Sequence, residues 1–255
     1  MLMAITREIS AAFDECHLTH LPRASIDIDR ARAQHTAYEW ALVEAGCTVR
    51  RLDSGPDMPD AVFVEDIAVV VAEGAILTRP GAEARRIETP GVVASLMRHG
   101  LPSQEIRSPG TLDGGDVLVV GRRVFVGLSA RTNRAGADQL VGILDAVGYT
   151  VSMVPVRGCL HLKSAVTAIA PDTVLINREW ISGEGFDGLS LVDVDPLEPH
   201  AANALAVGSI VIYPASFPRT QEKLEHRDLR LRIVEIDELQ KAEGAVTCCS
   251  LIFQL

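Results

Sequence analysis

The sequence has few basic residues relative to acidic ones and few aromatic residues. It contains 24 Lys and Arg against 34 Asp and Glu, which gives a net charge of -10 at pH 7. Such a surface repels the phosphate backbone, because binding to nucleic acid needs basic side chains that displace counterions. We therefore exclude nucleic acid and anionic membranes as partners and expect the charge to suit a cationic ligand.

Long hydrophobic runs are also absent. The first residues, from Met1 to Arg7, lack the basic region and apolar run that are typical of a signal peptide. No later stretch reaches the length of a membrane span without a charged residue. We therefore expect a cytoplasmic protein whose core, with only 4% aromatic residues, is built from Val, Leu, Ile and Ala.

Cysteine is scarce, and its spacing excludes two common structural roles. An odd number of cysteines without C-x-x-C spacing fits neither a disulfide framework nor a structural zinc site. Cys16, His17 and His20 lie close in sequence, but an adjacent Cys and His cannot easily turn to one ion, so this segment is predicted to be a surface loop. We expect reduced thiols and no bound metal. The five cysteines are Cys16, Cys47, Cys159, Cys248 and Cys249.

A repeated order of structural elements runs through the chain. A hairpin, an Arg-containing loop, a helix and a strand follow one another from residue 61 to 106, and the same order returns from 117 to 156. The second half repeats it more faintly, and the opening and closing segments complete a split unit. About five repeats of roughly 50 residues predict a ring of α/β units with polar loops around a central channel.

Several local predictions bear on the functional residues. Residues 4 to 28 are predicted to form mainly a loop, and a helix from Asp29 is predicted to end at Gly46. The β-branched run from Ala61 to Val71 predicts a strand that carries two carboxylates, Glu65 and Asp66. An unpaired buried charge is costly, so these carboxylates need either solvent or a partner.

Residue types that support nucleophilic chemistry occur in four polar blocks. Cysteine reacts as its thiolate, and an imidazole can lower the pKa of the thiol or remove its proton. In the third block, strand alternation separates His161 from its apolar neighbours, and Asp113 could orient that imidazole, because the following glycines allow close approach. The blocks are Asp60 to Asp66, Thr111 to Asp116, Cys159 to Ser164 and Thr247 to Ser250.

The additional carboxylates decide between classes of cysteine enzyme. Sets of Cys, His and Asp also occur in proteases and amidases, which stabilise a developing oxyanion. Asp60, Glu65 and Asp66 would repel an oxyanion and attract a cation. A planar guanidinium presents several donors in a fixed fork that carboxylates bind bidentately. The sequence therefore predicts chemistry on a guanidine group.

Five motifs resemble dimethylarginine dimethylaminohydrolases, members of a guanidino-group-modifying superfamily that includes arginine deiminases and amidinotransferases. The resemblance runs from about residue 30 to the C-terminus. It implies a five-bladed α/β propeller of pseudo-symmetric ββαβ units, the pentein fold, as one catalytic domain over residues 1–255. The motifs are Asp-Ala-Val-Phe-Val-Glu-Asp, Thr-Leu-Asp-Gly-Gly-Asp-Val-Leu, Val-Gly-Leu-Ser-Ala-Arg-Thr-Asn, Leu-His-Leu-Lys-Ser and Thr-Cys-Cys-Ser.

The resemblance also implies roles for single residues. Cys248 corresponds to the nucleophile, His161 to the general acid and base, and Asp113 to its carboxylate partner. The implied substrate-binding residues are Glu65 and Asp66 at the guanidinium, Asp60 at the α-amino group, Arg85 and Arg131 at the α-carboxylate, and Leu18 in a mobile lid loop.

The implied reaction is hydrolysis of an Nω-methylated arginine to L-citrulline and an amine through a covalent thiouronium on Cys248, without a cofactor. Zinc could bind Cys248 and His161 as an inhibitor, but two ligands do not make a metalloenzyme. Two alternatives remain open at this point, an arginine deiminase and a non-catalytic binder of cationic amino acids. The oligomeric state is open as well, and a homodimer is one option.

Overall fold

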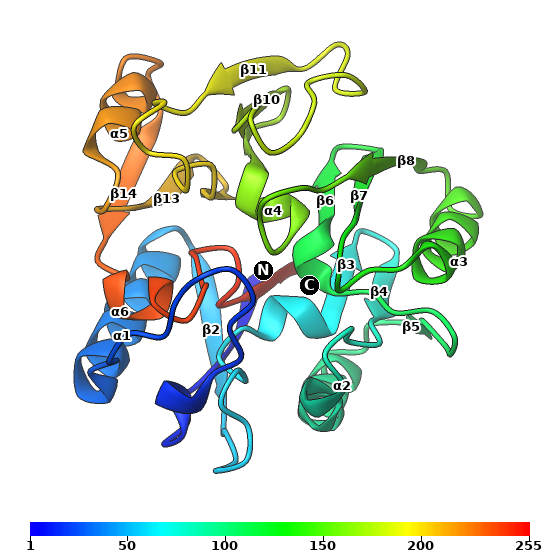
Figure 1. Cartoon of the computed structure of the whole chain (residues 1–255). Helices are drawn as coiled ribbons and strands as arrows, with labels where there is room; N and C mark the ends of the chain where they lie inside the picture. The colour runs from blue at the N-terminus through cyan, green and yellow to red at the C-terminus, as the bar shows by residue number, and fades with distance from the viewer.

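The computed structural model describes residues 1–255 and contains five three-stranded sheets around a common centre (Figure 1). In each sheet the middle strand pairs antiparallel with one neighbour and parallel with the other. The sheets are β15 (Leu251–Gln254), β1 (Leu2–Arg7) and β2 (Cys47–Leu52); β3 (Ala68–Val71), β4 (Gly74–Leu77) and β5 (Ser103–Glu105); β6 (Val117–Val120), β7 (Arg123–Leu128) and β8 (Thr150–Pro155); β9 (Val166–Ala170), β10 (Thr173–Ile176) and β11 (Ser190–Asp193); β12 (Leu205–Val207), β13 (Ile210–Pro214) and β14 (Arg230–Val234).

Helices connect the middle strand to the parallel strand in four of the five sheets, and Figure 1 shows them on the outside of the ring. The predicted ββαβ repeat is therefore confirmed, including the unit that is split between the two ends of the chain. In the fourth unit a loop replaces the helix. The crossover helices are α1 (Ile28–Glu44), α2 (Thr89–Arg98), α3 (Arg134–Asp145) and α5 (Pro218–Glu225), and the shorter helices are α4 (Leu162–Ala165) and α6 (Asp237–Gln240).

Helix α3 shows how the sequence specifies one of these elements. The Asn133 side chain accepts a hydrogen bond from the Gly136 backbone and so caps the helix, a contribution of about 1 kcal/mol. Ala137, Leu140 and Leu144 recur on one face and are fully buried between α3 and the sheets. Five hydrophobic clusters of this kind separate neighbouring units. The core is thus a ring of aliphatic contacts.

Two local predictions were wrong, and the prediction of a loop from 4 to 28 was right only outside β1 and a short helix. The segment from 4 to 28 includes most of β1, which pairs with β15 on one side and β2 on the other, and the short 3-10 helix η1 (Phe13–Glu15). The run from 61 to 71 is a strand only in β3, because Glu65 and Asp66 lie on the 3-10 helix η2 (Val64–Ile67). His161 is the residue before α4 and does not lie in a strand.

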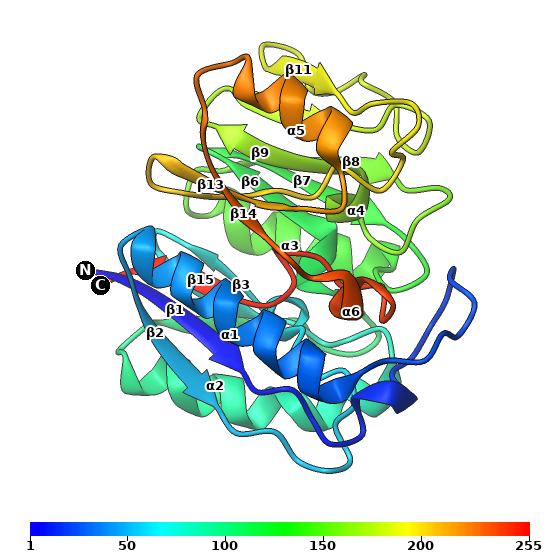
Figure 2. The same cartoon turned by 90° about the vertical axis from the view of Figure 1, so that its left-hand side faces the viewer.

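The first strand of each unit lines a central channel. A cavity of about 270 Å³ is bounded by residues of β3, β6, β9, β12 and β15, with Glu65, Lys163 and Thr247 among its lining residues. Figure 2 shows the two termini together on one side of the molecule, with the N-terminal loop and α6 on the other. None of the helices combines the length and the apolar character that crossing a membrane requires.

Candidate active site

Cys248 lies in the turn between α6 and β15. Its backbone N–H donates to the carbonyl of Ala245, and its own carbonyl accepts from the N–H of Glu65 at 3.1 Å. The Cys248 side chain is half-buried, whereas Cys249 next to it is 1% exposed and packs into the hydrophobic core. The first cysteine of the pair therefore lies against the turn that carries Glu65 and Asp66, called the acidic turn below. The second is part of the hydrophobic core.

The turn formed by η2 directs two carboxylates towards the centre of the molecule. Asp66 accepts a hydrogen bond from the Gly115 N–H at 3.0 Å and an ion-pair contact from Arg85. A side chain at position 115 would not fit, because a Cβ there would lie 2.7 Å from Nδ1 of His161 and 2.8 Å from Oδ1 of Asp66. The glycine pair that follows Asp113 thus permits the close packing of the imidazole and the carboxylate.

His161 is held by carboxylates from two polar blocks. Its Nε2 lies 3.0 Å from Oδ2 of Asp113 and 3.9 Å from Oδ1 of Asp66. Asp113 is completely buried and also accepts a hydrogen bond from the Gly81 N–H at 2.8 Å. A third carboxylate, Asp116, accepts from the N–H of Leu162 and fixes the start of α4. The imidazole therefore faces a strongly negative environment.

This environment favours the protonated form of His161. Burial by itself would lower the pKa of the ring, but Asp66, the hydrogen bond to Asp113, and Asp116 raise it to about 9. The same attraction acts on Asp66, where burial would raise the pKa but His161 and Arg85 hold it at about 2. Burial raises the pKa of Asp116 to about 6. At neutral pH the site therefore contains an imidazolium between carboxylates.

The surroundings that favour the charged form of His161 disfavour the charged form of Cys248. Burial raises the pKa of its thiol, and the charges of Glu65 and Asp66 raise it further, to about 12. These effects favour the neutral thiol at pH 7. A cation placed between the thiol and these carboxylates would offset their charge and favour the thiolate.

Glu65 is the second carboxylate of the turn and closes the channel side of the site. Its Oε2 accepts from the hydroxyl of Thr247 at 2.9 Å, and its Oε1 pairs with the ammonium of Lys163. Burial raises the pKa of Glu65, although Lys163 opposes this effect. Asn203 accepts from the Thr247 N–H and donates to the Lys163 carbonyl. These contacts fix the segment that carries Cys248.

The two arginines predicted to bind a carboxylate differ in their contacts. Arg85 is 4% exposed and donates to Asp66, to both oxygens of Glu88 and to the carbonyl of Phe63. Arg131 is less engaged, with Nη1 3.7 Å from Oδ2 of Asp113. Of the two guanidinium groups, that of Arg131 has more donors free for a ligand.

Asp60 holds the N-terminal loop at the residue before Leu18. Both oxygens of Asp60 lie within hydrogen-bond distance of the His17 N–H, and Oδ2 lies 2.6 Å from Nδ1 of His17. Leu18 follows directly and packs against the same hydrophobic cluster as Cys248. The structure therefore brings the predicted residues Cys248, His161, Asp113, Glu65, Asp66, Asp60, Arg85, Arg131 and Leu18 to one end of the channel.

Four polar residues at this end were not predicted from the sequence to have a role. Two of them, Lys163 and Glu88, contact predicted residues, the other two contact residues directly next to predicted ones, and only Lys163 lies in a recognised motif. Lys163 could have been identified from its position two residues after His161, since it offers a cation to the surplus carboxylates. The others gave no local signal. They are Lys163, Glu88, Asn203 and Glu243.

One group of side chains has the spacing of a metal site. Single ligand atoms of Asp66, Asp113 and His161 lie within 4.8 Å of one another. Asp66 is already paired with Arg85, and His161 is protonated at neutral pH, so a metal ion would have to displace both a guanidinium and a proton. These residues fit a proton-transfer site better than a metal centre.

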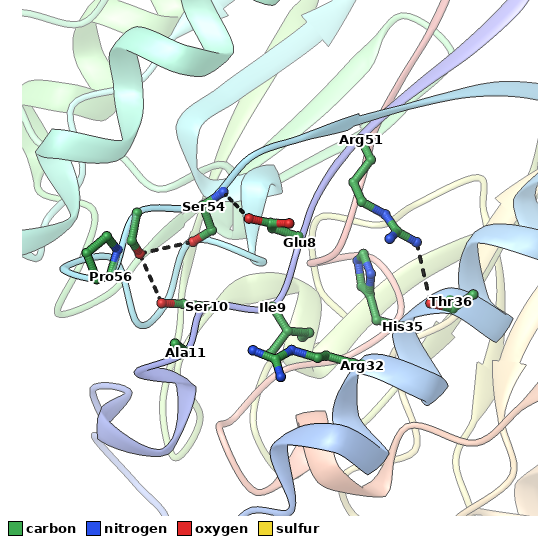
Figure 3. Close-up of a pocket in the computed structure, with 11 residues that line it drawn as sticks. Glu8, Ile9, Ser10, Ala11, Arg32, His35, Thr36, Arg51, Ser54 and Pro56 are labelled. Atoms are coloured by element: carbon green, nitrogen blue, oxygen red, sulfur yellow. Dashed lines mark hydrogen bonds between the residues drawn. The ribbon is translucent and has the colours of Figure 1, made fainter.

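Two further pockets lie outside the central channel. A polar pocket of about 460 Å³ between α1 and the segment that follows β1 is lined by Glu8, Arg32, His35 and Arg51, among others, and contains none of the predicted site residues (Figure 3). A second pocket of about 270 Å³ is lined by residues that flank the site, among them Leu21, Cys159, Asn203, Glu243 and Ala245. The second pocket adjoins the N-terminal loop and the Cys248 turn.

Comparisons with known proteins agree with this geometry. The family model described as "N,N dimethylarginine dimethylhydrolase, eukaryotic" matches residues 5–252. The N(G),N(G)-dimethylarginine dimethylaminohydrolase of Streptomyces coelicolor is 40% identical over 97% of this chain and 95% of its own length. The enzyme of the same name from Pseudomonas aeruginosa is 36% identical over 89% of this chain and 90% of its own.

Solved structures show the same fold. A cysteine-to-serine mutant of the Pseudomonas aeruginosa enzyme in complex with citrulline has a TM-score of 0.94 at 34% identity and covers 98% of both chains. The N-terminal domain of ArgZ, an arginine dihydrolase from cyanobacteria, has a TM-score of 0.88 at 19% identity over 98% of this chain and 97% of its own, which shows the fold alone. The chain belongs to the dimethylarginine dimethylaminohydrolase family, hydrolases that act on C–N bonds.

Proposed function

We propose that the protein hydrolyses Nω-methylated arginines, asymmetric dimethylarginine and monomethylarginine, to L-citrulline and dimethylamine or methylamine. The observation that carries this proposal is a half-buried thiol beside the turn of Glu65 and Asp66, with the His161 ring 3.9 Å from the Asp66 carboxylate. Such a pair accepts a flat cation with several N–H donors. The named relatives act on this class of substrate, and one was solved with citrulline.

The first half of the reaction is substitution at the guanidinium carbon. Binding of the cationic substrate offsets the charge of Glu65 and Asp66, so that the Cys248 thiol loses its proton to solvent. The thiolate attacks the guanidinium carbon and forms the C–S bond. His161 donates its proton to the methylated nitrogen while the C–N bond breaks, and the amine leaves. A thiouronium on Cys248 remains.

The second half is hydrolysis of this adduct. His161 is now neutral and removes a proton from a water molecule that attacks the thiouronium carbon. The C–S bond breaks with its electron pair on sulfur, the remaining hydroxyl proton passes to the Cys248 thiolate, and the C–O bond becomes the carbonyl of the ureido group of L-citrulline. Asp113 orients the imidazole in both steps, since its carboxylate lies 3.0 Å from Nε2. His161 thus donates the proton to the leaving amine and removes a proton from the attacking water.

The amino-acid end of the substrate would be held at the rim of the site. We assign the α-carboxylate to Arg131, whose donors are the less engaged, with Arg85 as the second guanidinium, and the α-amino group to Asp60 near Leu18. This assignment predicts that Arg131→Ala raises KM by about tenfold or more, because one charge-assisted contact is worth roughly 1.5–3 kcal/mol. The kcat should change much less. An unchanged KM would contradict the assignment.

The direct test is citrulline formation from asymmetric dimethylarginine, monomethylarginine and arginine. We expect turnover of both methylated substrates and a clear preference over arginine. Cys248→Ser should abolish turnover, and Cys249→Ser, which replaces the neighbouring buried thiol, should retain it. A preference for arginine would instead indicate a deiminase. Absence of turnover with all three substrates would leave only a binding function.

A further inference from the structure

A carboxylate far along the chain holds the backbone of the N-terminal loop. Glu243 accepts hydrogen bonds from three successive N–H groups, those of Thr19 at 3.0 Å, His20 at 2.5 Å and Leu21 at 2.6 Å. Backbone donors that converge in this way form an anion-binding nest. Here the anion is a side chain of the protein, 222 to 224 residues away in sequence.

The backbone at Glu243 is held in an unusual conformation. Its φ of 59° lies in the left-handed region, which costs a residue with a Cβ about 1–2 kcal/mol. Gly244 follows and packs so tightly on Phe63 that a Cβ would lie 2.2 Å from the ring. Phe63 directly precedes η2, so the turn that carries Glu243 is packed against the acidic turn of the site.

The loop is attached at its other end as well. His17 contacts Asp60 through both its N–H and its ring, and Leu18 lies between this attachment and the nest. The segment from His17 to Leu21 is therefore held at one end by Asp60 and at the other by Glu243, which lies in the turn before Cys248. This segment is called the strap below.

The strap also contacts the machinery proposed for catalysis. The hydroxyl of Thr19 lies 3.3 Å from Nη2 of Arg131, and Nη1 of the same guanidinium lies 3.7 Å from Oδ2 of Asp113. Asp113 in turn holds His161. A displacement of the strap would therefore remove one of the contacts that orient Arg131.

We propose that Glu243 is a positioning residue: its carboxylate fixes the strap over the Cys248 turn and so places Leu18 and Arg131 for the amino-acid end of the substrate. The kinetic part of this inference rests on the proposed function. Loss of the carboxylate would free three N–H groups and open the wall of the second pocket, which His20, Leu21 and Glu243 line together. The Cys248–Glu65 backbone contact and the His161–Asp113 contact would remain.

Glu243→Gly is the informative variant. Glycine adopts a positive φ without strain, so the substitution removes the carboxylate while the turn keeps its conformation. Glu243→Gln keeps one acceptor oxygen and should behave as an intermediate. Glu222→Gln is the matched control, because the Glu222 side chain is 74% exposed on α5 and its only ion-pair contact is with His226 at 4.0 Å.

Hydrogen exchange measures the strap without any turnover. In Glu243→Gly we expect amide exchange in a peptide covering residues 17–22 to accelerate about tenfold or more, the factor that corresponds to 1.4 kcal/mol of lost protection. The melting temperature should stay close to that of the wild type. In Glu222→Gln both quantities should be unchanged. Unchanged protection in Glu243→Gly would overturn the inference, whatever the protein's substrate is.

Kinetics then test the positioning role. With the methylarginine substrate we expect Glu243→Gly to raise KM by about tenfold with a smaller change in kcat, and Glu243→Gln to restore part of the loss. Faster exchange with an unchanged KM would refute positioning. If the wild type turns over no methylated arginine, the proposed function fails. Calorimetric binding of L-citrulline to the wild type and to Glu243→Gly then tests the strap instead. Equal affinity in the two proteins would overturn the positioning role of Glu243.

Discussion

Replacing the imidazole should change how the stability of the protein depends on pH. His161 has a pKa of about 9 in the folded protein against 6.5 in the unfolded chain. At roughly 1.36 kcal/mol per pKa unit, its contacts with the surrounding carboxylates contribute about 3 kcal/mol to the free energy of unfolding. The depressed pKa of Asp66 reports the same attraction from the other partner, so the two effects are not added.

The sign follows from where the proton is bound. Between pH 6.5 and about 9 the folded protein retains the His161 proton and the unfolded chain releases it. The contribution is therefore complete below pH 6.5 and is lost as the pH rises through about 9. His161→Gln lacks this proton at every pH. The difference in unfolding free energy between wild type and variant should thus shrink by about 3 kcal/mol from pH 6 to pH 9.

Urea denaturation of both proteins at pH 6, 7, 8 and 9 measures this difference. The five cysteines also affect stability near pH 9, because unfolded thiols begin to ionise there, but both proteins contain them and the subtraction removes their effect. If the two unfolding free energies change in parallel between pH 6 and pH 9, His161 is not held as an imidazolium, and its proposed role as the acid at neutral pH loses its basis.

Three further predictions concern fixed contacts. Lys163→Met leaves the buried Glu65 carboxylate without its cation and should lower the free energy of unfolding by about 3–5 kcal/mol. Adding Glu65→Gln should recover part of this loss. Urea denaturation that shows no loss for Lys163→Met would contradict the pairing. Gly115→Ala places a Cβ 2.7 Å from Nδ1 of His161, so kcat should fall by about tenfold or more while the fold survives, as steady-state kinetics and thermal denaturation can show. Tyr38→Phe removes a buried hydrogen bond of 2.7 Å and should cost about 1 kcal/mol in urea denaturation.

The repeating units could be predicted from the sequence because their signals are local. Each hairpin is a short β-branched run divided by a tight turn, and most of the crossover helices end at a glycine. Gly46, Gly100 and Gly148 follow α1, α2 and α3 with positive φ angles of 95°, 73° and 83°. Such signals depend only on neighbouring residues. The order of the elements followed directly from them.

The conformation of the acidic turn could not be predicted in the same way. The β-branched and other apolar residues on both sides of Glu65 and Asp66 are typical of a strand. The Glu65 N–H nevertheless bonds to the carbonyl of Cys248, and the Asp66 carboxylate to Gly115 and Arg85. These partners outweigh local propensity, as tertiary contacts often do. Glu243 could not be identified for a related reason, since its partners lie more than 220 residues away.

The pairing of β15 with β1 links the order of assembly to reactivity. Leu2 pairs with Gln254, and the amino group of Met1 lies 2.9 Å from the carbonyl of Leu255. The last strand must therefore find the first before the ring is complete, and Cys248 is only three residues from that strand. Until the two ends meet, Cys248 has no fixed position beside Glu65. A chain in which this pairing is open would thus lack the assembled site, even if the other four sheets were formed.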